Sequence, residues 1–513
     1  MADKEALERQ DTLQSIQQQD TLEEIVQDAR KNADTVHKDE AVKVLANYTG
    51  DLHWTDQEEK VLTRKIDKRL MPILILTYGL QYYDKAMLAQ AALFGLPEDL
   101  NLIGTRYSFS AAIFYLGFIC GATPAILLAQ RFPIERVATA IVFIWGIVMM
   151  STAGCGSWKG LFAQRFFLGM VEAGVSPMFM LVVSSFYKKN EQALRMGLWY
   201  CATGYVSIVS PLINYGLGHI SGGALNSWQY MYLVAGGLTV IWSFVIFFFM
   251  PPDPIRVKGF TDRERYIAIA RLRSNNSGVR NTHFKLAQAL EVFMDPRPWI
   301  VFAMAFLIMI ANGPVSTFIP IIIHSFGFST LNSLLLVMPA GAIIGTIEWL
   351  APFICYKYVG VRTWAIAVCQ CGTIFAALLL WLLPRSAIGG LLYGALTLAC
   401  FGGSYAVLMG LQTANTAGYT KKSVSASWIF LGYCLGNFVG PLLFKEKDAP
   451  VYAPGFTAVV ITSTLAALLS IVYRYLSMWE NNRRDKAGIL ESYQHAYDDD
   501  LTDTKNPQFR YQL

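Results

Sequence analysis

Apolar runs separated by short polar loops make up most of the chain beyond residue 70. A run of about 20 mostly apolar residues can cross a bilayer as a helix. The runs are continuous and do not alternate between apolar and polar positions, which favours helices over the strands of a membrane barrel. We therefore predict an all-α membrane protein with twelve transmembrane helices, at residues 70–94, 107–129, 136–154, 160–186, 194–219, 229–250, 298–323, 331–352, 363–383, 387–411, 424–444 and 456–478.

A long polar connection, residues 251–297, follows the sixth predicted helix and divides the helices into two sets of six. Within it, Thr261 and Glu264 have the spacing of a capping box, and TDRERYIAIARLR predicts a basic amphipathic helix on the inner membrane surface or a solvated loop helix. The expected organisation is a disordered cytoplasmic tail at 1–60, a six-helix bundle at 61–250, a linker at 251–297, a second six-helix bundle at 298–480 and a cytoplasmic tail at 481–513.

Composition agrees with this interpretation, because 54% of the residues are hydrophobic and only 15% are charged. A net charge of +5 offers no argument for nucleic-acid binding. Basic residues gather in alternate loops, such as those with Arg131, Lys188 and Lys421, and in the linker. The positive-inside rule then places both termini in the cytoplasm, as an even number of spans also requires. The eight cysteines lie in or beside apolar runs and are expected to be small buried hydrophobes.

Two opposite charges lie inside the fourth predicted helix, at Arg165 and Glu172. Their spacing of seven residues places both on one helix face. A charge near the centre of a bilayer costs roughly 2.5–3.5 kcal/mol on insertion scales, so we expect this face to meet protein or a watery cavity. Two interpretations remain open: groups that act in a central cavity, or a permanent ion pair that only fixes the helix.

Polar residues also interrupt other predicted helices. Asp84 and Lys85 follow Gly79 in the first helix, which suggests a bend; because they are adjacent, one can face a cavity while the other meets a neighbouring helix. Asn312-Gly313-Pro314 predicts a break in the seventh helix. Further polar candidates in or beside the spans are Tyr82, His324, Glu348, Asn415 and Asn437.

Motifs of common enzymes are missing from the sequence. It contains no Walker loop, HExxH, paired CxxC or GxSxG. We therefore expect no enzymatic activity, no catalytic residue, no metal site and no cofactor.

Several segments together resemble a known family. They are RKIDKRLMP before the first predicted helix, QRFFLGMVEAGVSPMF in the fourth, ANTAGYTKKS before the eleventh, FLGYCLGNFVGP within it, and the ending DDDLTDTKNPQFRYQL. The chain resembles the major facilitator superfamily, and specifically the fungal anion:cation symporter branch around allantoate permease. This resemblance covers residues 60 to 513.

The resemblance implies a monomeric transporter in the plasma membrane that takes up a small organic anion with protons by alternating access; carboxylates, ureides and vitamins are the expected classes. An exporter of a secondary metabolite by proton exchange and a nutrient receptor that no longer transports are the alternatives. The candidate substrate-binding residues are Arg165, Lys85, Tyr82, Asn312, Asn415 and Asn437. The candidate proton-coupling residues are Glu172 and Asp84.

Overall fold

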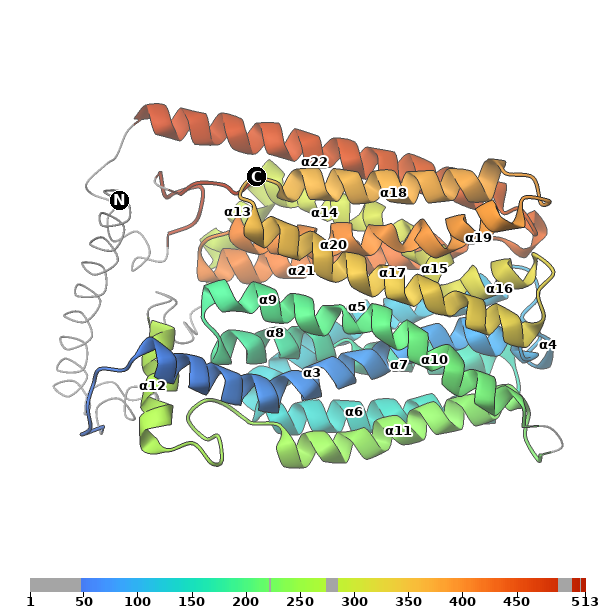
Figure 1. Cartoon of the computed structure of the whole chain (residues 1–513), viewed down its shortest axis with the longest axis horizontal. Helices are drawn as coiled ribbons and strands as arrows, with labels where there is room; N and C mark the ends of the chain where they lie inside the picture. The colour runs from blue at the N-terminus through green and yellow to red at the C-terminus, as the bar shows by residue number, and fades with distance from the viewer. Residues whose placement is uncertain (1–47, 221–222, 274–284, 488–500, 508) are drawn as a thin grey trace.

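The computed structural model describes residues 48–220, 223–273, 285–487, 501–507 and 509–513, in which helices and turns occur and no strand does. Helices are the form in which a lipid-facing chain can satisfy its own backbone hydrogen bonds. Figure 1 shows two bundles side by side, one coloured blue to green and the other yellow to red. We call them the first half (56–249) and the second half (296–487).

The first half runs from α3 to α11. Its helices are α3 (Asp56–Ala92), α4 (Leu96–Asp99), α5 (Arg106–Arg131), α6 (Ile134–Ser151), α7 (Trp158–Glu172), α8 (Val175–Phe186), α9 (Lys189–Tyr200), α10 (Ala202–Gly218) and α11 (Ser227–Phe249). Helix α5 packs on α7 and α6 on α11, which builds the first half as one unit.

The second half runs from α14 to α22, after two linker helices. The linker helices are α12 (Asp262–Arg273) and α13 (Leu286–Met294). They are followed by α14 (Pro296–Ile310), α15 (Asn312–Thr317), α16 (Ile319–His324), α17 (Thr330–Lys357), α18 (Arg362–Leu382), α19 (Ile388–Thr397), α20 (Phe401–Ala414), α21 (Tyr419–Leu442) and α22 (Ala453–Ala487). Helix α14 packs on α21 and α18 on α22, while α10 with α17 and α5 with α21 join the two halves.

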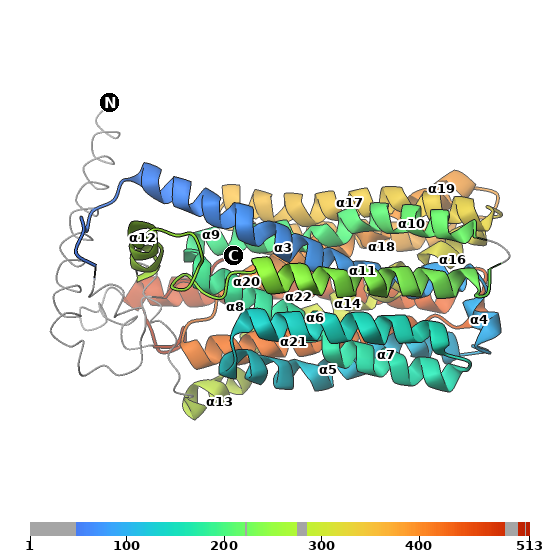
Figure 2. The same cartoon turned by 90° about the horizontal axis from the view of Figure 1, so that it is seen from below.

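The helices lie roughly parallel, so the bundle has two distinct ends. Both views place α12 at one end and α4 and α16 at the other (Figures 1 and 2). We call these the α12 end and the α4 end. Within the described residues, nine helical segments are long and apolar enough to span a membrane. Helices α3, α5 and α21 fall outside that set but pack within the same bundle. The count of twelve spans and the cytoplasmic termini stay predictions.

The first helix begins earlier than the sequence pattern suggested. Residues 1–47 of the predicted tail lie outside the described residues, but α3 already starts at Asp56. Thr55 and Glu58 form a capping box there: the Thr55 amide donates to the Glu58 carboxylate (2.9 Å), and the Glu58 amide donates to Thr55 Oγ1 (3.3 Å). Helix α3 is uninterrupted from Asp56 to Ala92, so the chain does not leave the helix at Gly79, and the predicted bend there stays a prediction.

The predicted break in the seventh helix is confirmed. Helix α14 ends at Ile310, and the short helices α15 and α16 continue the same path to His324, which is exposed. The fourth predicted helix is also divided, since α7 ends at Glu172 and α8 begins at Val175. These interruptions place backbone irregularities next to polar residues in the middle of the bundle.

The linker helix α12 has the predicted capping box. The Thr261 amide donates to the Glu264 carboxylate (2.8 Å), and the Glu264 amide donates to Thr261 Oγ1 (3.2 Å). The helix is not a solvated loop helix, because residues 266–271 are buried against the first half. At its exposed start, a hydrogen bond from Arg263 lowers the pKa of Glu58 to about 2, so this pair stays ionised at neutral pH.

Arg271 joins α12 to three segments of the first half. Its side chain is fully buried and donates to Thr63 Oγ1 of α3 (2.6 Å) and to the Phe186 backbone oxygen at the end of α8 (2.7 Å). The carboxylates of Glu59 and Glu191 lie 3.8 and 3.6 Å from its guanidinium group. Because a buried guanidinium needs several hydrogen bonds and an opposite charge, this cluster determines where α12 can sit.

We predict that Arg271→Met destabilises the protein by about 3 kcal/mol, because two carboxylates then lose a buried cation. Thermal unfolding of the purified protein in detergent measures this. The matched control is Arg256→Met in the same linker, where a guanidinium that is 54% exposed lies 3.9 Å from Asp253 and contributes less than about 1 kcal/mol. Equal unfolding temperatures for the two variants would contradict the prediction.

Candidate functional site

A polar cavity lies between the two halves. Its walls come from α3, α5, α9 and α10 of the first half and from α14, α15, α17, α20 and α21 of the second. Six aromatic side chains surround it: Tyr78, Tyr82, Tyr115, Tyr200, Phe401 and Tyr433. Its volume is about 40 Å³. Since one water needs roughly 10–15 Å³, this space is large enough for a few waters and too small for an organic molecule.

Lys85 brings a positive charge to this cavity. Its ammonium group lies 5.7 Å from the Phe114 ring centre and 5.2 Å from that of Phe118, both on α5. In the part of the chain that the structure describes, no carboxylate forms an ion pair with it. The neighbouring Asp84 points elsewhere: its carboxylate accepts a hydrogen bond from Trp145 Nε1 of α6 (2.6 Å). The two adjacent side chains on α3 therefore point to different places. Lys85 faces the cavity, and Asp84 faces the interior of the first half.

Arg165 lies away from the cavity, inside the first half. It is 3% exposed, its Nε donates to the Ser110 backbone oxygen (3.4 Å), and its guanidinium carbon lies 5.0 Å from the Phe114 ring centre. Its Nη1 is buried without a hydrogen-bond partner among the described residues. Contact with an aromatic face offsets part of the desolvation of this cation.

Glu172 is fully buried at the end of α7. Its carboxylate faces the side chains of Asp84 and Gln81, although neither oxygen makes a well-aligned hydrogen bond within the described ranges. Gln81 of α3 donates to its backbone oxygen (3.3 Å), and its side chain interacts electrostatically with Asp84 and Lys85. Among the residues described, Arg165 and Glu172 form no ion pair, and neither lines the cavity between the halves, so their part in transport stays a prediction.

The remaining predicted substrate residues divide between two places. Tyr82 and Asn312 line the cavity. Asn437 of α21 lies just behind Asn312 and accepts a hydrogen bond from its amide (2.6 Å). Asn415 does not line the cavity and lies instead at the α12 end, where its Nδ2 donates a hydrogen bond to the Tyr473 hydroxyl (2.9 Å). One polar cluster therefore contains Tyr82, Lys85, Asn312 and Asn437, and excludes Asn415.

Two further residues were not assigned a role from the sequence. The Thr203 hydroxyl of α10 lies within hydrogen-bond distance of two acceptors, the Tyr200 backbone oxygen (2.9 Å) and the carboxylate of Glu348 on α17 (2.6 Å). The second contact crosses between the halves at the cavity wall. Glu348 was noticed as a polar residue in an apolar run. Thr203 carried no signal, because a threonine in a membrane helix usually bonds its own backbone.

Small residues allow the two halves to approach closely beside this bond. A Cβ atom on Gly204 would lie 2.1 Å from the backbone nitrogen of Gly345, so only glycine fits where α10 crosses α17. Such close backbone contact is typical of helix packing in membranes.

Hydrogen bonds also close the α4 end. Tyr107 donates to the Thr317 backbone oxygen (2.9 Å), and Ser108 donates to that of Phe444 (2.8 Å). Both donors belong to the first residues of α5 and both acceptors to the second half. These two bonds therefore join the halves at the α4 end.

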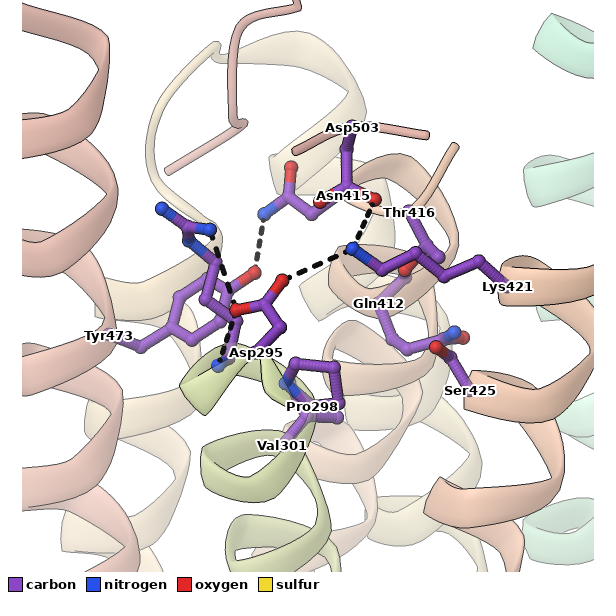
Figure 3. Close-up of a pocket in the computed structure, with 11 residues that line it drawn as sticks. Asp295, Pro298, Val301, Gln412, Asn415, Thr416, Lys421, Ser425, Tyr473 and Asp503 are labelled. Carbon is purple, nitrogen blue, oxygen red and sulfur yellow. Dashed lines mark hydrogen bonds and ion pairs between the residues drawn. The ribbon is translucent and has the colours of Figure 1, made fainter. Parts of the chain in front are cut away.

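A second polar cluster surrounds Lys421 at the α12 end of the second half. The Lys421 ammonium lies 2.9 Å from Asp503, 3.0 Å from Glu291 and 3.2 Å from Asp295. Figure 3 shows it reaching between Asp295 and Asp503. The Lys421 side chain is 1% exposed, so three carboxylates balance one buried cation.

The chain's own C-terminal segment covers this cluster. Asn415 Nδ2 donates to the Gln512 backbone oxygen (2.9 Å), and the Gln512 amide donates back to Asn415 Oδ1 (2.7 Å). The guanidinium group of Arg297 lies 3.9 Å from the Tyr511 ring centre. We therefore interpret the cluster as a structural attachment of residues 501–513, and Asn415 as part of it.

Two helical halves around a polar internal cavity are typical of membrane transporters. The family model of the Major Facilitator Superfamily matches residues 74–441. The chain therefore belongs to the major facilitator superfamily and is a multi-pass membrane protein.

Relatives over most of the chain are transporters too. An uncharacterised transporter of Schizosaccharomyces pombe is 33% identical, with 94% of this chain and 92% of that protein covered. Allantoate permease of Saccharomyces cerevisiae is 29% identical, with 93% and 90% covered. A thiamine pathway transporter of the same yeast is 28% identical, with 94% and 92% covered.

Solved structures confirm the fold. The Escherichia coli xylose transporter XylE, in a partially occluded inward-open conformation, matches with a TM-score of 0.61 and 16% identity, covering 79% of this chain and 97% of that one. A bacterial homologue of the human lysosomal transporter Spinster matches with a TM-score of 0.59 and 15% identity, covering 82% and 98%.

We predict that Lys421→Met lowers stability by about 3 kcal/mol, since three carboxylates would remain beside an apolar side chain. Thermal unfolding in detergent is the measurement, with Lys447→Met at an exposed lysine as the control. Adding Asp503→Asn to Lys421→Met should restore part of the loss, because it removes one of the repelling charges. A double variant that is less stable than Lys421→Met would contradict this account of the cluster.

Proposed function

We propose that this protein is a secondary active transporter that takes up a small organic anion together with protons. The observation that carries this proposal is Lys85, a cation in the cavity between the halves without an ion-pair partner among the described residues. Burying an ammonium group without a counter-ion is costly, so a protein retains it where an anionic ligand will supply the missing charge. The relationship to allantoate permease supports an anionic substrate and a plasma-membrane location.

Tyr82 and Asn312 are placed to orient the bound anion, since both line the cavity with Lys85. Asn437 holds the Asn312 amide through its own side chain. Arg165 is proposed to act indirectly: its charge lies beside Phe114, the ring that Lys85 also contacts. This aromatic ring separates the two cations and keeps Lys85 directed at the cavity.

Glu172 is the proposed proton carrier, with Asp84 beside it. Lys85 interacts electrostatically with Glu172, so the charge state of the cavity is coupled to this carboxyl group. An anion bound at Lys85 neutralises the positive charge that faces Glu172, and a proton can then take its place. Substrate and proton are thereby loaded together, and neither charge crosses the membrane alone.

Alternating access completes the mechanism. The halves close the α4 end through Tyr107 and Ser108, and rocking of one half against the other would break these bonds and expose the cavity at that end. The close packing at Gly204 and Gly345 provides a contact about which the halves can move.

One prediction of this proposal concerns the substrate class. Uptake of labelled carboxylates, ureides and vitamins by cells without their own permeases should be faster at external pH 5 than at pH 7, because protons accompany the anion. Lys85→Met should abolish this uptake, whereas Lys159→Met, at an exposed lysine, should leave it unchanged. Uptake that survives in Lys85→Met would remove the basis for an anion site.

Another prediction of this proposal concerns the coupling of substrate uptake to protons. Glu172→Gln should abolish accumulation of substrate against its gradient but preserve exchange of substrate across the membrane, because exchange needs no net proton movement. Glu98→Gln, at an exposed carboxylate, is the control. Proteoliposomes with an imposed pH gradient distinguish the two activities. If Glu172→Gln still concentrates substrate in response to the gradient, the proton-carrier assignment is wrong.

A further inference from the structure

The linker helix α13 has two unlike sides. Its exposed residues are all apolar: Leu286, Ala287, Leu290, Phe293 and Met294. At about 100° per residue they fall within an arc of about 120°, so they form one continuous stripe along the helix. We call this stripe the outer face of α13. It is well exposed, since Leu286 is 64% and Met294 81% accessible.

Contacts on the opposite side fix the direction of the outer face. The Gln288 side-chain oxygen accepts a hydrogen bond from the Thr420 amide (3.1 Å), and the Glu291 carboxylate lies 3.0 Å from the Lys421 ammonium. Val292 is fully buried on the same side. Turning the outer face toward the protein would break these contacts with the start of α21. The apolar stripe is therefore directed away from the bundle by the fold itself.

Aromatic side chains connect the outer face to the membrane-spanning helices. The Phe293 ring centre lies 5.2 Å from that of Trp428 on α21 and 6.4 Å from that of Trp299 near the start of α14. The Trp299 side chain is exposed, and its Nε1 donates to the Phe293 backbone oxygen (3.0 Å). Tryptophan is enriched at the membrane–water interface, where its ring meets lipid and its N–H group stays hydrogen-bonded. This cluster marks α13 as lying at the depth of that interface.

The other linker helix has the reverse arrangement. The apolar residues of α12, such as Tyr266 and Ile267, are buried against the first half, whereas Asp262 is exposed. An amphipathic helix on the inner membrane surface was expected from the sequence of α12. The helix whose exposed side suits that position is α13.

We propose that α13 is an in-plane membrane anchor, whose outer face lies among the headgroups and upper acyl chains of the leaflet at the α12 end. Figure 2 shows α13 at the outer edge of the bundle at this end, and α14 begins directly after it. Nine residues are too few to span a bilayer, but an apolar stripe of this length can enter the interface. Water would leave five apolar side chains solvated, and lipid removes that cost.

The anchor also acts on the second half. Glu291 projects from α13 toward Lys421, which pairs with Asp503 of the C-terminal segment as well. Lipid on one side of α13 and the buried cation on the other hold the helix between them. The membrane thereby keeps the end of the linker and the C-terminal segment in place beside α21.

Contact with lipid is tested by photo-cross-linking of the full chain. Photoactivatable p-benzoylphenylalanine is introduced at position 290, and the protein is irradiated in liposomes of phosphatidylcholine and phosphatidylserine. The control is position 61 on α3, where Val61 is 57% exposed but lies among charged residues outside the predicted span. Mass spectrometry should find at least about fivefold more lipid adduct at position 290, because only there does an exposed apolar side chain meet the bilayer.

Anchoring is tested by hydrogen exchange in the same liposomes. The double variant Leu290→Gln with Met294→Gln keeps the charge of α13, and glutamine is a good helix former. The amides of residues 286–294 should exchange about tenfold faster in this variant, because loss of apolar contact makes local opening more frequent. In the control Val61→Gln, exchange of residues 56–69 should stay within about twofold of the wild type, since no lipid contact is lost.

The outcomes are decisive in both directions. Cross-links at position 290 to a second copy of the chain would show that the outer face is a protein interface, and a yield no higher than at position 61 would place it in water. Either result overturns the proposal. Lipid adducts without faster exchange in the double variant would overturn the anchoring role. If the double variant does not fold, the cross-linking result decides alone, because it requires no polar substitution.

Discussion

The cost of placing charge inside an apolar bundle governs this structure. Arg165, Glu172 and Asp84 lie in helices surrounded by apolar residues, and each is buried within the first half. In the part of the chain that the structure describes, none of these three side chains forms an ion pair. Asp84 accepts a hydrogen bond from the indole N–H of Trp145. Arg165 donates to a backbone oxygen and packs against an aromatic ring. The first half thus carries buried charge that is only partly compensated, which is the state in which small changes of charge have large effects.

The second half is organised differently, and its buried charge serves attachment. Three carboxylates form ion pairs with the Lys421 ammonium group: Glu291 of the linker, Asp295 at the start of α14 and Asp503 of the C-terminal segment. In the same way, Arg271 attaches α12 to the first half. Each half therefore holds its own part of the linker through a buried cation. The two linker helices are therefore each attached to a different half.

Much of the fold could be predicted from the pattern of apolar runs, whereas the site could be predicted only in part. Short local motifs correctly indicated the break at Asn312 and the capping box of α12, because both depend on residues close in sequence. The spacing of Arg165 and Glu172 placed them on one face, but which neighbour each would meet depends on α3 and α5, which are distant in sequence. Thr203 could not be identified from the sequence for the same reason, because its partner Glu348 lies in the other half and is distant in sequence.

The position of the aromatic side chains explains how Lys85 and Glu348 can line one cavity without forming an ion pair. Lys85 rests against the rings of Phe114 and Phe118, and Glu348 is held by Thr203 on the opposite wall. A lysine over an aromatic face gains attraction without giving up its charge, so its ammonium group can remain near the ring when no anion is present. Had the two charges paired directly, the cavity would be self-satisfied and a ligand would have to break an ion pair before binding. Because they are kept apart, neither charge is neutralised by the other in this conformation.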